Sequence, residues 1–72
     1  MRSIDRRDNI LKLLLESTEP IKGSHIAKEY SVTRQIIVKD IAILRAKGKN
    51  IIATPDGYII NKNENKVKQL LL

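Results

Sequence analysis

The residues with the most suggestive chemistry form a short segment that begins at Thr33. Arg34 and Gln35 follow it directly, and Val38 and Lys39 come one helical turn later. An arginine can make two hydrogen bonds to guanine, a glutamine two to adenine, and a small apolar side chain can contact the methyl group of thymine. A threonine hydroxyl and a lysine ammonium can bind phosphate oxygens. These five side chains therefore have the chemistry to read a DNA duplex and to hold its backbone.

The rest of the chain offers little support for other chemistry. There is no cysteine, and His25 is the sole histidine, so disulfides and thiolate zinc sites are excluded and no metal is expected. No nucleophile–base pair and no phosphate-binding glycine loop is present, so we do not expect an enzyme. Fourteen Lys and Arg against eight Asp and Glu give a net charge of +6, which favours a polyanionic partner.

Length and hydropathy restrict the number of domains and the location of the protein. Its 72 residues are enough for one small domain. No apolar run approaches the roughly 18 residues that a membrane span requires. We therefore expect a cytoplasmic protein without a membrane partner.

Two helices are predicted before the Thr33 segment. Residues 3–16 carry apolar side chains at helical spacing, and Ser3 is a candidate N-cap. The segment Ser17-Thr18-Glu19-Pro20 should end the first helix, because proline disfavours helix in the residue before it. Ser24 is the candidate cap of a second, short helix through Tyr30, and its hydroxyl could also meet a DNA phosphate.

A third helix is predicted from Arg34 to about Lys47, with Thr33 as its N-cap. Ile37, Ile41 and Leu44 fall at i, i+4 and i+7 and form one apolar stripe, which we expect to be buried. The polar segment described above then lies on the opposite, outward face of the helix.

A glycine and a hairpin follow the third helix. Gly48 is the residue typical of the position just past a helix end. The β-branched runs at residues 50–54 and 58–60 are separated by Pro55-Asp56-Gly57, which indicates a hairpin. The predicted order of elements is typical of an α+β winged helix-turn-helix. It runs helix, short extended piece, helix, very short turn, helix and hairpin. In that fold the third helix enters the major groove and the hairpin, or wing, lies near the DNA backbone.

Several side chains have a structural interpretation beside the functional one. Val38 could pack on the wing instead of facing DNA. Arg2, Arg6 and Arg7 are expected on a solvated face more than on a DNA clamp. Tyr58 is expected mainly as a packing residue, and base readout by the wing is doubtful because Asp56 at its tip would repel phosphate.

The third helix and its flanks resemble the winged-helix regulators related to the biotin repressor. Those proteins commonly carry Val-Ser-Arg-Gln, an apolar stripe and then Arg-Ala-x-Gly. The corresponding segments here are Val32-Thr33-Arg34-Gln35 and Arg45-Ala46-Lys47-Gly48. Together with Pro20-Ile21-Lys22-Gly23 before them, they make residues 4–60 most similar to the niacin-responsive repressors of NAD biosynthesis. The family often has glycine in the turn where this chain has Ser31, a cost of roughly 1 kcal/mol if the backbone there is left-handed.

This resemblance implies the DNA-binding half of a transcriptional repressor, with DNA contacts at the residues named above. It implies that residues 1–60 form the DNA-binding domain, and that residues 61–72 are a linker and the start of an effector domain. In the family that second domain binds nicotinic acid and a metal, so no cofactor is expected in this chain, and the full-length protein is expected to be a homodimer. Two alternatives stay open: the regulatory domain of a biotin ligase, and a winged-helix module that binds proteins.

Overall fold

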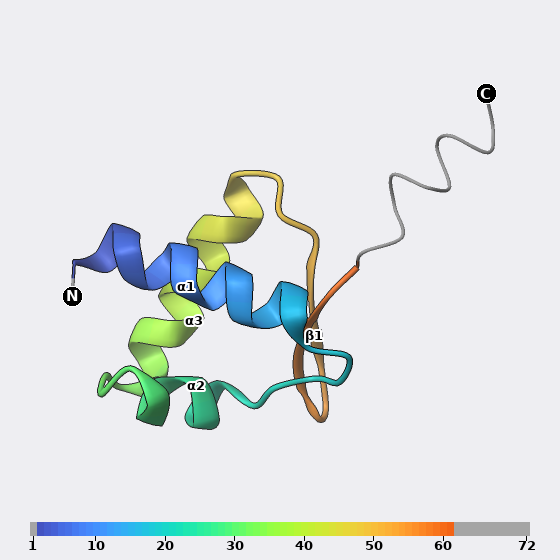
Figure 1. Ribbon diagram of the computed structural model, residues 1–72, viewed down its shortest axis with the longest axis horizontal. Helices are drawn as coiled ribbons and strands as arrows, with labels where there is room; N and C mark the ends of the chain where they lie inside the picture. The colour runs from blue at the N-terminus through green and yellow to red at the C-terminus, as the bar shows by residue number, and fades with distance from the viewer. Residues whose placement is uncertain (1, 62–72) are drawn as a thin grey trace, which may run out of the picture.

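The computed structural model describes residues 2–61, which form three helices followed by a hairpin. The elements are α1 (Ser3–Glu16), α2 (Gly23–Glu29), α3 (Arg34–Ala46), β1 (Ile51–Thr54) and β2 (Gly57–Ile60). Helix α1 lies across α3, α2 lies near the start of α3, and the hairpin lies beside the C-terminal end of α1 (Figure 1). This order confirms the predicted α+β winged helix-turn-helix. The predicted linker and start of a further domain lie, from residue 62 on, outside the described residues.

The core is aliphatic and draws on every element. Its buried side chains are Ile10, Leu14, Ile26, Ala27, Ile37, Ile41, Leu44, Ile51 and Ile60. The apolar stripe predicted on the third helix is therefore confirmed. On α1 the apolar pattern is wider than the buried strip, because Ile4 and Leu15 remain 50% and 48% exposed.

One carboxylate, Asp40 of α3, is buried together with two arginines of α1. Its side chain is 2% exposed, and it accepts hydrogen bonds from Nε and Nη2 of Arg6, the latter at 3.2 Å. Nη1 of Arg7 lies 3.6 Å from the same carboxylate. The hydrogen bond to Asp40 is the main reason that the pKa of Arg6 is raised. The prediction of a solvated face for Arg6 and Arg7 is wrong, because α1 crosses α3 at this carboxylate.

The turn between α2 and α3 combines a residue in the left-handed conformation with a side-chain cap. Ser31 has φ 56, the left-handed conformation expected where the family often has glycine. Two residues later the hydroxyl of Thr33 accepts a hydrogen bond from the Ile36 amide at 3.3 Å, which confirms Thr33 as the N-cap of α3. The start of α3 is therefore fixed by its own sequence.

Helix α3 ends at the predicted glycine. Gly48 has φ 90, and its amide donates to the carbonyl of Arg45 at 2.9 Å. The amide of Lys49 donates to the carbonyl of Leu44 at 3.1 Å. This pair of bonds is the Schellman arrangement, which satisfies carbonyls that the helix itself leaves free and turns the chain toward the hairpin.

Two predicted helix caps are wrong. Helix α1 starts after Arg2, so Ser3 lies inside its first turn. Helix α2 starts after Lys22, so Ser24 lies inside the helix and does not cap it. The amides of His25 and Ile26 close the first turn of α2 on the Lys22 carbonyl at 3.0 and 3.1 Å. No side chain caps this start.

The hairpin is joined to the segment that precedes α2. The amide of Ile21 donates to the Tyr58 carbonyl at 2.9 Å, and the Tyr58 amide donates back to the Ile21 carbonyl at 2.8 Å. Gly57 has φ 134, and a Cβ there would lie 2.4 Å from the carbonyl carbon of Ile21. Glycine thus allows β2 to approach this backbone, which holds the hairpin next to the start of α2.

Candidate nucleic-acid interface

The outward face of α3 carries the side chains that the sequence singles out. Arg34, Gln35, Val38 and Lys39 are all exposed, as is Thr33 at the cap. Val38 is 44% exposed and is not among the side chains packed against the core. Because the buried stripe fixes the rotation of the helix, the candidate base-reading side chains point away from the core, as predicted.

One flank of this face borders the hairpin. Nε of Arg45 donates to the Ile51 carbonyl at 2.8 Å, which ties the end of α3 to the first wing strand. Arg34, Val38 and Arg45 lie at i, i+4 and i+11 and so share this side of the helix. The wing is therefore held against the same helix that presents the candidate base-reading residues.

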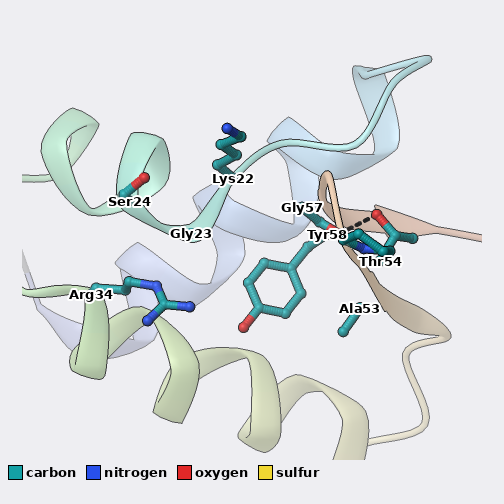
Figure 2. A pocket seen from close by; sticks show the side chains of 9 residues that line it. Lys22, Gly23, Ser24, Arg34, Ala53, Thr54, Gly57 and Tyr58 are labelled. Atoms are coloured by element: carbon teal, nitrogen blue, oxygen red, sulfur yellow. Dashed lines mark hydrogen bonds between the residues drawn. The ribbon is translucent and has the colours of Figure 1, made fainter.

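A hollow of about 380 Å³ lies at the start of α3, between α2 and the hairpin. Figure 2 shows the guanidinium of Arg34 and the hydroxyl end of the Tyr58 ring extending toward each other within it. The residues that line it are Lys22, Gly23, Ser24, Arg34, Ala53, Thr54, Pro55, Gly57 and Tyr58. Two of them are cationic and none is acidic, so the hollow favours an anionic neighbour such as a phosphate.

The structure brings together only some of the predicted site residues. Ser24 and Arg34 both line the hollow, although they belong to different helices. Gln35, Val38 and Lys39 are not among its lining residues and lie along the exposed side of α3. These five residues thus form two adjoining parts of one candidate surface.

Sequence reasoning missed Lys22, and it expected Tyr58 mainly as a packing residue, which agrees with its contact with the hydrophobic core. Both line the hollow, and they come from segments 36 positions apart in the sequence. The spacing of residues within one element cannot predict that such distant residues come together. Gly57 was the one available signal, since its place next to Tyr58 is required by the close approach of β2 to residues 21 and 22.

Within residues 2–61, no three His, Cys, Asp or Glu side chains come together as metal ligands would. No helix in the same range is long and apolar enough to cross a bilayer. Neither observation tests the prediction that an effector binds to another domain of the full-length protein.

A family model described as "HTH domain" matches residues 6–59, which include all three helices and most of the hairpin. The chain belongs to this family of HTH domains. Its helix-turn-helix is formed by α2, the turn at Ser31 and α3. In HTH domains the second of these two helices is the one that enters the major groove, and here that helix is α3.

Two transcription repressors are similar to this HTH domain. A protein named as the probable transcription repressor NiaR of Thermotoga maritima is 45% identical over 67 residues, which is 93% of this chain and 38% of that protein. The transcription repressor NadR of Bacillus subtilis is 49% identical over 55 residues, 76% of this chain and 31% of that protein. The chain therefore spans about a third of the length of these relatives, and it resembles the repressor family that the sequence indicated.

Proposed function

We propose that this HTH domain is the DNA-binding part of a transcription repressor and recognises a specific duplex sequence through α3. The observation that carries the proposal is the exposed face with Arg34, Gln35, Val38 and Lys39, held outward by the buried stripe on the other side of the helix. Repression follows from occupying an operator, so the chain needs no catalytic role.

The contacts are assigned by the chemistry of each side chain. Arg34 pairs with a guanine and Gln35 with an adenine in the major groove, and Val38 contacts a thymine methyl group. Lys39 and the exposed start of α3 at Thr33 hold the phosphate backbone. Ser24 lines the hollow beside Arg34 and reaches a phosphate on the same side.

We infer that the regulated genes serve NAD biosynthesis or niacin uptake. The names of the two similar repressors and the resemblance over residues 4–60 support this assignment. The full-length protein would bind as a homodimer to half-sites about one helical turn, or a multiple of it, apart. Nicotinic acid and a metal would bind to its effector domain. We propose a cytoplasmic location, because both similar repressors come from bacteria, whose DNA lies in the cytoplasm.

The first test is selection of binders from a randomised duplex pool by the 72-residue chain. We expect enrichment of a short motif with a guanine next to an adenine. A pool that stays random, with weak binding that salt barely affects, would contradict the proposal and favour a protein-binding module.

A matched pair of lysine variants tests the orientation of the domain on DNA. Lys39→Ala removes a cation from α3, and Lys12→Ala removes one from the exposed surface of α1. Each lost phosphate contact lowers the slope of log affinity against log salt by about 0.9. We expect that loss for Lys39→Ala and an unchanged slope for Lys12→Ala, measured by titration of one duplex at several salt concentrations. The reverse pattern would mean that α1, and not α3, faces the DNA.

A further inference from the structure

The position of the Tyr58 ring is fixed by backbone that lies far from it in the sequence. The paired hydrogen bonds between Ile21 and Tyr58 set the register of β2 against the segment before α2. Gly57 has no room for a Cβ beside Ile21 and Lys22, so β2 lies directly against this segment. The backbone that carries the ring is therefore held both by the hydrogen bonds to Ile21 and by the close approach at Gly57.

The ring and Arg34 both lie close to the same glycine. A Cβ added to Gly23 would lie 3.2 Å from Cε2 of Tyr58 and 3.9 Å from both Cγ and Nε of Arg34. Both side chains therefore lie next to the bare backbone of Gly23 and line the hollow, where Figure 2 shows them extending toward each other. Gly23 follows a residue with extended backbone and is the first residue of a helix. The position therefore requires the small size of glycine and not its conformational freedom.

We infer that Tyr58 is a positioning residue for sequence readout, because its ring limits the conformations that Arg34 can adopt before DNA arrives. The inference rests on the proposed function. An arginine side chain has many rotamers, and immobilising it during binding weakens the complex. A ring that already confines the side chain reduces that loss. The wing then affects base recognition through Arg34, without touching a base.

The readout is the ratio of affinities for the selected site and for random duplex DNA. Tyr58→Ala should lower this ratio roughly three- to tenfold, the range that corresponds to the immobilisation of one long side chain. Tyr58→Phe keeps the ring and should keep the ratio. If Tyr58→Phe loses as much as Tyr58→Ala, the hydroxyl is a DNA contact and the positioning role is wrong.

Gly23→Ala tests the same contact without removing the ring. Its methyl group would press on the ring at 3.2 Å, whereas alanine is the better helix former. We expect a smaller drop in the ratio, with the thermal unfolding midpoint maintained or raised. An unchanged ratio would overturn the inference even if Tyr58→Ala failed to fold.

A double-mutant cycle with Arg34→Ala decides between positioning and other effects of the wing. Once Arg34 is absent, Tyr58→Ala and Gly23→Ala should cause no further drop in the ratio. Further drops of the same size would show that the ring acts independently of Arg34. A wild-type chain with no preference for any sequence would instead reject the proposed function itself, so the two failures are distinguishable.

Discussion

Arg34 is the single residue on which base recognition depends most in this proposal. Arg34→Ala should weaken binding to the selected site by about 1–3 kcal/mol and binding to random duplex by less, because a lost bidentate contact affects the correct base most. Fluorescence anisotropy titrations of both duplexes measure the two losses. Equal losses would make Arg34 a phosphate contact in the cationic hollow.

Arg34→Lys is the matched control for that variant. Lysine keeps the positive charge but lacks the planar fork that pairs with guanine. We expect it to keep the affinity for random duplex and to lose most of the preference for the selected site. Full retention of the preference would show that charge alone suffices at this position.

Asp40 is the residue on which the packing of α1 against α3 depends. It is 1% exposed and is the partner of both Arg6 and Arg7, so Asp40→Ala leaves two partly buried guanidinium groups without a carboxylate. We expect the free energy of unfolding to fall by about 3–5 kcal/mol in urea titrations. Asp56→Ala, at the exposed turn of the hairpin, should change it by less than about 0.5 kcal/mol. A loss below about 1 kcal/mol for Asp40→Ala would mean that the ion cluster contributes little.

At the scale of elements, the docking of the hairpin depends on Gly57. Gly57 and Gly48 both have positive φ, 134 and 90, so alanine is strained at either position. Only at Gly57 would the new Cβ meet other backbone, whereas nothing lies within 4 Å of it at Gly48. The loss expected for Gly57→Ala therefore combines this clash with a backbone that lies further from the left-handed region than that of Gly48.

Gly48→Ala should cost about 1 kcal/mol of stability from the unfavourable left-handed backbone alone. Gly57→Ala should cost about 1–3 kcal/mol more, the usual penalty for forcing atoms into filled space. Thermal unfolding of the two variants measures the difference. Equal losses would show that β2 can withdraw from the segment before α2 without cost.

At the scale of the whole molecule, we expect the 72-residue chain to be a monomer. Over the described residues, the exposed large apolar side chains are Ile4, Leu15, Val38 and Ile52. They lie on three different elements, α1, α3 and β1, whereas obligate dimers use broad apolar interfaces. Sedimentation velocity at micromolar concentration should give the mass of one chain. A dimer that persists on dilution would contradict this expectation.

The sequence by itself determined what depends on near neighbours. The spacing of Ile37, Ile41 and Leu44 set the rotation of α3, and Thr33 and Gly48 set its two ends. Side chains three or four positions apart share a helix face, and caps bond within the adjoining turn. The outward position of the candidate DNA-binding residues follows from these local rules, as does the order of the elements.

Only the tertiary structure decided what depends on distant segments. Helix α2 starts at Gly23, although the local signal suggested Ser24 as its N-cap. This start lies next to the point where the Tyr58 backbone pairs with Ile21. Asp40 is buried because α1 brings Arg6 to it from 34 positions away. The hollow at Arg34 likewise forms from α2, α3 and the hairpin together. Such contacts depend on how the core stacks the elements, and no periodicity within one element contains that information.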